Sequence, residues 1–351
     1  MKKVLSILLT LMMALSVAPF AAQASDLSSG VEDPKGIIFE HLGDTYGWAA
    51  PFSHSTYIPL PIIVRDCNGD WHVFSSARVE HGATYDGFKI SSEGEYKGKL
   101  VGTDANGAEY RPLAISITKN VAALFISALV VVLCVMSIYR WYKKNPLKAP
   151  RKGTAFLELK VEFVYSSVVR PTLGKNAKKF GPYLLTVFFL ILIMNLLGLI
   201  VIFPGGANLT GNIAVTLVLA LFTFFITNVF GTKHYWKEVF WPEVPVWLKA
   251  PVPMMPVIEF FGLFTKPFAL MIRLFANIMA GHAAILSLLA IIFITVKVGP
   301  LINGTMTFVS VAFGVFMTAL EVLVAFIQAY VFTMLSAVFI GHSRVKEEKK
   351  E

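Results

Sequence analysis

The sequence of 351 residues has few charged side chains and only two cysteines. Charged residues make up 15% of it, whereas soluble domains average about 25%. Hydrophobic residues make up 56%, which excludes both an ordinary soluble protein and an intrinsically disordered one. Cys67 and Cys134 are too few for a disulfide framework or a four-ligand metal site. The composition therefore indicates a membrane protein.

The first residues have the features of a secretory signal peptide. Lys2 and Lys3 precede an apolar run, which ends in the small residues of Ala22-Gln23-Ala24. We expect residues 1–24 to be a cleaved signal peptide, the alternative being a first transmembrane helix that is never cut. In both cases residue 25 onward lies outside the cytoplasm.

Residues 25–115 are polar and contain no run of membrane length. Apolar segments flank Asn68-Gly69 and again flank Asn106-Gly107, and such pairs favour the two left-handed positions of a type I′ hairpin turn. The sequence therefore predicts a small, partly β extracytoplasmic segment. Its histidines lack a tight ligand spacing, so we expect no metal ion there.

Five apolar segments follow, at residues 117–139, 183–203, 213–230, 256–298 and 305–341. Eleven Lys and Arg residues stand against two acids between residues 140 and 181, whereas residues 25–115 contain thirteen acids and seven Lys and Arg. Positively charged loops stay in the cytoplasm. We therefore expect an all-α polytopic membrane protein of about five transmembrane helices in a domain at residues 116–342, with residues 25–115 periplasmic and the tail 343–351 cytoplasmic. The net charge of +9 then needs no nucleic-acid partner.

Two connecting segments and two long helices complete this prediction. Residues 155–173 alternate apolar and charged side chains, which favours an amphipathic helix at the cytoplasmic interface; residues 231–255 form a cytoplasmic stretch rich in Lys, Trp and Pro. The last two apolar segments would be about 65 and 55 Å long as helices, although the hydrocarbon core is only about 30 Å thick. A turn at residues 299–304 makes them an antiparallel hairpin whose helices tilt, bend or run along the interface.

Ionisable residues inside a membrane segment are costly and are therefore candidates for function. Those of the hairpin are Glu259, Lys266, Arg273, His282 and Glu321, accompanied by the polar Asn277 and Gln328. Residues at equal depth in an antiparallel hairpin have a constant index sum, here about 602 from the turn near residue 301. This arithmetic pairs Arg273 with Gln328 and His282 with Glu321, and it places Glu259 near His342.

The chemistry of these groups predicts proton transfer. A histidine and a carboxylate in contact can exchange protons near neutral pH, so His282 and Glu321 form a candidate relay; the alternative is a structural ion pair. Arg273 does not release its proton and acts as a fixed positive charge, unless it is a structural arginine that reaches the interface. His282 lies nine residues from Arg273, about 180° around a straight helix. The two residues therefore interact with different partners, or the helix bends between them, and Gly281 is the candidate position of such a bend.

The run from Arg273 to His282, preceded by Glu259 and Thr265-Lys266-Pro267, resembles the signature of subunit a of F-type ATP synthases. Residues 205–216 and 325–332 resemble its loop and last-helix motifs, and the resemblance covers residues 117–342. It implies a non-catalytic stator in the bacterial inner membrane, without a cofactor or a metal ion. The stator provides two half-channels beside a rotating ring of c subunits, so that proton flow drives ATP synthesis, and it also contacts peripheral-stalk b subunits and membrane lipid.

The resemblance also implies roles for single residues. Arg273 matches the arginine that faces the ring carboxylate, and Gln328 matches its neighbour on the last helix. Glu259 matches a position of the cytoplasmic half-channel, whereas His282 and Glu321 match two positions of the outer half-channel that some members hold in the opposite order. Asn277 belongs to the same motif, and the role of Lys266 stays open. We expect protons in preference to sodium ions, although the family's ion choice rests largely with the ring.

Two other functions are alternatives to this one. A proton-coupled secondary transporter would use the same charged cluster, but it predicts internal repeats and interrupted helices, and no clear repeat is visible. A membrane enzyme would need a nucleophile or a metal cluster, and the sequence has neither. The family core also requires no segment like residues 25–115, whose role the resemblance does not explain.

Overall fold

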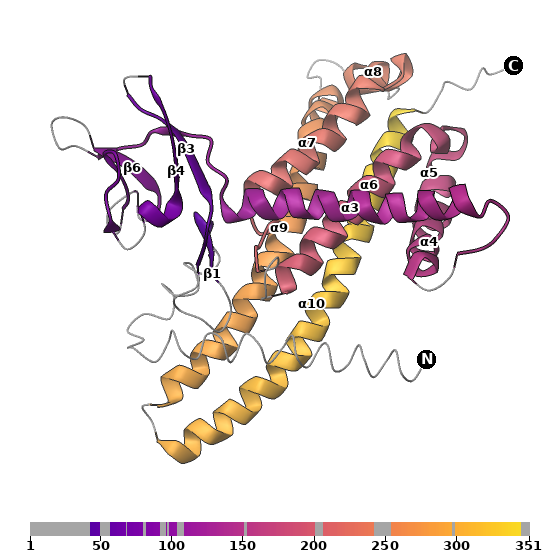
Figure 1. The fold of residues 1–351 in the computed structure, drawn as a ribbon. Helices are drawn as coiled ribbons and strands as arrows, with labels where there is room; N and C mark the ends of the chain where they lie inside the picture. The colour runs from indigo at the N-terminus through magenta and orange to yellow at the C-terminus, as the bar shows by residue number, and fades with distance from the viewer. Residues whose placement is uncertain are drawn as a thin grey trace, which may run out of the picture. The chain divides into compact units, whose positions relative to one another are not determined.

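The computed structural model describes residues 43–49, 57–67, 69–79, 82–91, 96, 98–103, 109–150, 153–200, 206–241, 254–296 and 299–344. The predicted signal peptide, Asn68, the Asn106-Gly107 pair and residues 345–351 of the predicted tail lie outside these residues. Short strands occupy the N-terminal part and helices the rest (Figure 1), which confirms the predicted fold class. The chain divides into two compact units: Met1–Ile126 with Leu197–Leu209 and Ala284–Thr318, and Ser127–Leu196 with Thr210–Ala283 and Ala319–Glu351.

The N-terminal strands form three small antiparallel sheets, ordered β1-β2, β4-β3-β8 and β5-β6-β7. Their core is a cluster of buried apolar side chains that includes Ile62, Val64 and Phe74 from one sheet and Phe88 and Leu100 from another. The strands are β1 (Gly47–Ala49), β2 (Tyr57–Pro59), β3 (Pro61–Arg65), β4 (Trp71–Ser75), β5 (Phe88–Ile90), β6 (Leu100–Thr103), β7 (Glu109–Tyr110) and β8 (Leu113–Ala114).

The predicted hairpin around residues 68 and 69 is confirmed, because β3 and β4 pair with Val64 opposite His72. Its turn differs from the predicted type I′ geometry. The Gly69 N–H donates to the Asp66 carbonyl at 3.0 Å, so Gly69 is the fourth residue of the turn and not a central one. Its φ of 95° still requires the freedom of glycine. Strands β6 and β7, on either side of the second Asn-Gly pair, are also antiparallel neighbours.

Hydrogen bonds tie this strand-containing segment to the start of α3 (Lys119–Lys144). The Lys119 N–H donates to the Thr45 carbonyl at 2.8 Å, and the Asn120 N–H donates to Asp44 Oδ1 at 3.1 Å. Just before the helix, the Ile117 N–H donates to the Pro61 carbonyl at 3.2 Å. The segment is therefore held against the first turn of α3.

The helices follow the predicted segments, with several corrections. The helix predicted at residues 155–173 begins as α4 (Gly153–Val164), passes through a π-helical turn (Tyr165–Val169) and ends with α5 (Arg170–Leu173). Gly174, with a φ of 50°, is the first residue of a short 3₁₀ turn (Gly174–Asn176), which α6 (Ala177–Leu199) follows. After α7 (Ile213–Val229) the chain bends by 104° into α8 (Lys233–Phe240). The prediction missed α8, whose first turn is capped by the Thr232 side chain.

The last two helices are α9 (Met254–Val296) and α10 (Pro300–Ser343), of 43 and 44 residues. They confirm the two overlong segments, but the predicted turn at residues 299–304 is too long. Helix α10 already begins at Pro300, since proline suits the first helical position, where no N–H is needed. Within the described residues, four helices are long and apolar enough to cross a membrane, or five when α7 and α8 count as one bent span.

Candidate functional site

His282 of α9 and Glu321 of α10 lie side by side. His282 Nδ1 is 3.7 Å from Glu321 Oε1, and the two side chains are 19% and 10% exposed. This contact confirms the spatial pairing that the index sum predicts. The distance is within ion-pair range when the imidazole is protonated, but it is too long for a direct hydrogen bond.

Gly281 makes room for the Glu321 carboxylate. A β-carbon at residue 281 would lie 2.5 Å from Glu321 Oε1, closer than side chains approach one another. Because α9 remains helical through this residue, the glycine is a point of close approach between two helices and not a helix break. This arrangement favours the first of the two alternatives, in which Arg273 and His282 address different partners.

The second carboxylate oxygen of Glu321 is buried. No residue in the described part of the chain gives Oε2 a hydrogen bond, although Glu321 as a whole is only 8% exposed. A buried carboxylate oxygen without a partner costs free energy unless water or a proton reaches it. Glu321 is therefore placed where such an exchange can occur.

Arg273 and Asn277 share the exposed side of α9. Both are exposed, whereas Leu270 and Leu274, each three residues before one of them and therefore next to it on the helix surface, are buried. Arg273 and Asn277 therefore lie at the edge of the buried side of α9. Within the described residues, no hydrogen bond or ion pair to Arg273 is present. The exposed guanidinium therefore has no charged or hydrogen-bonded partner in the described part of its own chain, although it lies in the middle of a long apolar helix.

Gln328 lies on the buried side of α10, with an exposed fraction of 6%. The structure thus places it among packed side chains while Arg273 is exposed, and no hydrogen bond joins the two. One turn earlier, Asn195 Nδ2 of α6 donates to the Ala325 carbonyl at 3.3 Å. Thr210 Oγ1 donates to Asn195 Oδ1 at 2.7 Å, so a satisfied polar network holds α10 next to Gln328.

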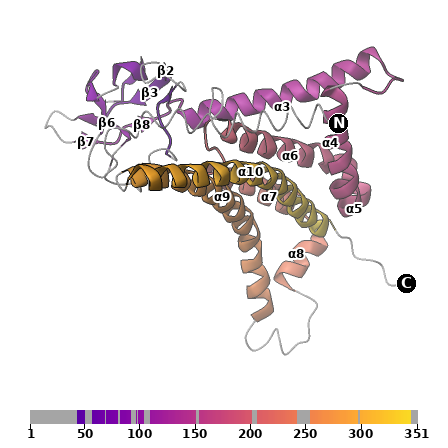
Figure 2. The same ribbon diagram turned by 90° about the horizontal axis from the view of Figure 1, so that it is seen from below.

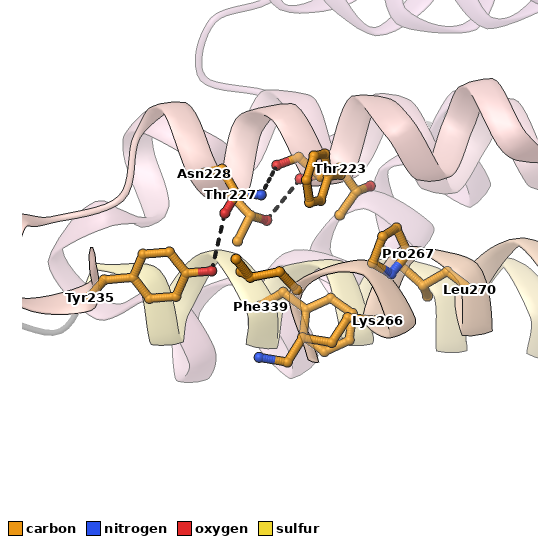
Figure 3. Close-up of a pocket in the computed structure, with 10 residues that line it drawn as sticks. Thr223, Thr227, Asn228, Tyr235, Lys266, Pro267, Leu270 and Phe339 are labelled. Carbon is orange, nitrogen blue, oxygen red and sulfur yellow. Dashed lines mark hydrogen bonds between the residues drawn. The ribbon is translucent and has the colours of Figure 1, made fainter. Parts of the chain in front are cut away.

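At the other end of the hairpin, Glu259 and Lys266 form a loose pair. Lys266 Nζ is 3.7 Å from Glu259 Oε1, and both residues are half-buried. The ring of Tyr235 on α8 lies 6.4 Å from the ring of His342. Lys266 also lines a small hollow between α7, α8, α9 and α10 (Figure 3).

The hollow brings together residues that the sequence prediction did not single out. Tyr235 OH donates to Asn228 Oδ1 at 3.2 Å, Asn228 Nδ2 donates to the Phe224 carbonyl at 2.8 Å, and the Thr227 hydroxyl donates to the Thr223 carbonyl at 2.8 Å (Figure 3). The signal in the sequence is the polar spacing of residues 223, 227 and 228 inside an apolar helix. The lining residues are Thr223, Phe224, Thr227, Asn228, Tyr235, Leu263, Lys266, Pro267, Leu270 and Phe339.

Comparisons with known proteins decide the family. Residues 121–341 match the family model described as ATP synthase A chain. The chain belongs to this family. Residues 37–120 match a second family model, described as a domain of unknown function (DUF8433). Among the described residues, no three His, Cys, Asp or Glu side chains gather closely enough to hold a metal ion together.

Curated relatives of this chain carry the same family name. ATP synthase subunit a of Chloroherpeton thalassium is 42% identical over 243 residues, which cover 67% of this chain and 68% of the relative. ATP synthase subunit a 2 of Chlorobaculum tepidum is 45% identical, covering 65% and 63%, and ATP synthase subunit a of Myxococcus xanthus is 43% identical, covering 66% and 74%. The resemblance drawn from the sequence motifs is confirmed, and with its apolar helices the chain is a multi-pass membrane subunit of an ATP synthase.

Proposed function

We propose that this chain is the ion-translocating stator subunit of an F-type ATP synthase, and that the hairpin of α9 and α10 carries its ion path. It makes or breaks no covalent bond itself. Its partners are a ring of c subunits, on which a carboxylate faces Arg273, and b subunits of the peripheral stalk. Protons, in preference to sodium ions, are the transported species.

Arg273 is the observation that carries this proposal. A charge in the middle of an apolar helix costs at least about 2.5–3.5 kcal/mol in a membrane, yet Arg273 is exposed and has no acidic partner in the described part of its own chain. A carboxylate on a neighbouring subunit would neutralise it. Because arginine keeps its proton, it holds that carboxylate by charge and prevents a bare proton from passing straight across.

The remaining polar groups divide into two candidate half-channels. His282 and Glu321 form the outer one, where a proton enters from the periplasmic side. Glu259 lies toward the cytoplasmic side, with Lys266 and the hollow beside it. Asn277 shares the exposed side of Arg273, and Gln328 lies on the facing helix. Residues 25–115 are then periplasmic and the C-terminus is cytoplasmic, in agreement with the positive charge of the loop after α3.

Replacement of Arg273 tests the proposal. In inverted membrane vesicles that contain the assembled complex, Arg273→Ala should abolish ATP-driven proton pumping, measured with a pH-sensitive dye, while the c ring still co-purifies. Arg140→Ala is the matched control, since it removes the same group from an exposed position on α3 and should leave pumping near the wild-type rate. Normal pumping by Arg273→Ala would contradict the proposal.

A further inference from the structure

One sheet of the N-terminal segment exposes a row of apolar side chains. Residues directly opposite in antiparallel strands point to the same face. Ile63 stands opposite Val73, and Arg65 stands opposite both Trp71 and Leu113, while the Ile115 N–H extends the pairing to the Ile63 carbonyl. The face that results, called the outer sheet face here, consists of Ile63, Arg65, Trp71, Val73, Leu113 and Ile115.

The outer sheet face is unusually exposed for its composition. Val73 is 70% exposed, Ile115 61%, Leu113 60% and Trp71 52%, whereas Ile62 and Val64 on the opposite face are fully buried. Single exposed apolar residues are ordinary on protein surfaces, but a contiguous group of them marks an interaction surface.

The position of the sheet indicates what this surface meets. Ile115 is four residues from Lys119, the first residue of α3, which limits their separation to about 14 Å. The sheet β5-β6-β7 packs on the opposite face through Phe88 and Leu100, and β6 lies on the side of β3 away from the start of α3 in both views (Figures 1 and 2). The outer sheet face therefore lies on the side where α3 begins.

We propose that the outer sheet face rests on the lipid surface at the point where α3 enters the membrane. The hydrogen bonds from residues 117, 119 and 120 to this segment keep the sheet at that point. Trp71 suits the interfacial region of a bilayer, and the Arg65 guanidinium carbon, 6.0 Å from the centre of its ring, can reach lipid phosphates while the apolar side chains contact acyl chains. The occupant is lipid and not a further protein subunit.

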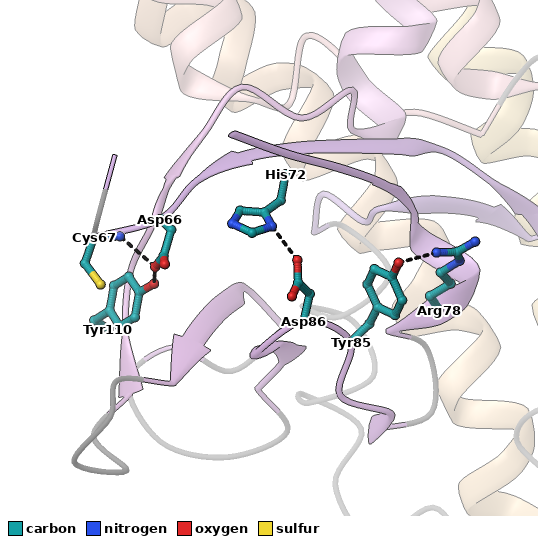
Figure 4. A network of polar contacts seen from close by, with 7 residues as sticks. All are labelled: Asp66, Cys67, His72, Arg78, Tyr85, Asp86 and Tyr110. Carbon is teal, nitrogen blue, oxygen red and sulfur yellow. Dashed lines mark hydrogen bonds and ion pairs between the residues drawn. The ribbon is translucent and has the colours of Figure 1, made fainter. Parts of the chain in front are cut away.

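Apart from the hydrogen bond that Arg65 Nε donates to the Gly69 carbonyl at 3.1 Å, the following polar side-chain contacts of the segment lie away from the outer sheet face. His72 pairs with Asp86, Tyr110 with Asp66 and Arg78 with Tyr85 (Figure 4). His72 alternates along β4 with the exposed Trp71 and Val73 and so points to the opposite face. The outer sheet face is left with Arg65 as its one charged residue.

Site-directed fluorescence on the full chain tests the proposal. In a background of Cys67→Ser and Cys134→Ala, Val73→Cys is labelled with the polarity-sensitive dye NBD, and the chain is reconstituted in vesicles of phosphatidylcholine and phosphatidylglycerol. Thr103→Cys is the matched control, because it is an exposed position on β6 of the other sheet. The emission at residue 73 should be shifted to the blue, and lipids with a nitroxide headgroup should quench it several-fold more strongly than the emission at residue 103.

Each other outcome overturns the proposal. Equal quenching and equal emission at residues 73 and 103 would mean that the face is open to water. A blue shift at residue 73 without quenching by the nitroxide lipid would mean that protein covers the face, either another subunit or another part of this chain. Ile115→Cys provides a second reading outside the paired strands β3 and β4, so that a folding defect of one variant does not decide the result.

Discussion

The strand-containing segment and the α9–α10 hairpin treat charged side chains in opposite ways. In the segment, Lys89 Nζ and Glu109 Oε1 are 2.8 Å apart, and His72 contacts Asp86 directly. In the hairpin, the two ion pairs are loose, at 3.7 Å. Arg273 has no acidic partner in the described part of the chain, and one oxygen of Glu321 has no hydrogen bond there.

This contrast is the reverse of what stability alone would produce. Pairing contributes only about 0–1 kcal/mol between charges in water, whereas an unpaired charge inside a membrane costs several times more. The close ion pairs therefore lie in the segment, where they contribute little free energy. The incompletely paired charges lie in the hairpin, where they cost the most. Charges left incomplete in the costly environment are available to an ion or to a neighbouring subunit, which is why we assign function to the hairpin and not to the segment.

After the loss of pumping expected for Arg273→Ala, the largest expected effect on this contrast comes from the relay pair. His282→Ala and Glu321→Gln each remove one titratable group, so ATP-driven proton pumping should fall by about tenfold or more. The double variant His282→Glu with Glu321→His restores both groups in the opposite order and should recover part of the rate. Vesicle pumping assays, normalised to the assembled complex on native gels, measure it; single variants that pump at the wild-type rate would make the pair structural.

Gly281→Ala tests the same pair without changing a charge. The added methyl group would lie 2.5 Å from Glu321 Oε1 and must displace the carboxylate from His282. We expect pumping to fall several-fold while assembly is retained. Gly262→Ala is the matched control on α9, because a β-carbon there meets nothing within 4 Å. An equal loss of pumping in both variants would mean that the change in helix propensity, and not the contact with Glu321, causes the effect.

Hydropathy and charge were enough to predict the helices, but not how each one begins. Long apolar runs define α3, α9 and α10 because only helices of that length satisfy their backbone in lipid. The sequence predicts that Pro300 lies in a turn, although proline is equally suited to the first turn of a helix. The stretch with α8 is rich in Lys, Trp and Pro and has the composition of a loop. Its apolar residues nevertheless recur at helical spacing, as in Tyr235 and Val239, and Thr232 caps the first turn.

The sequence predicts the level of each site residue along the hairpin, but not the side of the helix on which it lies. Two continuous antiparallel helices fix which residues share a level, so the contact of His282 with Glu321 followed from arithmetic on residue numbers. The side of the helix that carries Arg273 depends on packing around Leu270 and Leu274, which no index sum contains. The hollow at Lys266 could not be predicted for the same reason, since residues from four helices contribute its lining.

Asn195→Leu tests a polar group of the helical region whose hydrogen bonds are satisfied, in contrast to Arg273 and Glu321. It removes the hydrogen bonds to the Ala325 carbonyl and to Thr210, which should cost about 1–3 kcal/mol because partners are left buried and unpaired. The thermal midpoint of the purified chain should fall, while pumping per assembled complex should change little. Thr186→Val is the control, since its hydroxyl is exposed on α6 and bonds only within that helix.

The smallest effect is expected in the strand-containing segment, at Asp66 and Tyr110. The hydrogen bond from the Tyr110 hydroxyl lowers the pKa of Asp66 below its ordinary value, and burial raises the pKa of Tyr110. A carboxyl whose pKa is lower in the folded state stabilises the fold above its unfolded pKa of about 3.9, and this contribution is lost as the pH falls through the folded value. In Tyr110→Phe, the carboxyl titration of Asp66, followed by ¹³C NMR on the full chain in micelles, should move up toward that unfolded value. Tyr85→Phe, whose hydroxyl accepts from Arg78, should leave it in place. An unchanged midpoint in Tyr110→Phe would show that the close pairs of this segment contribute nothing even to titration, which would make the contrast with the hairpin sharper still.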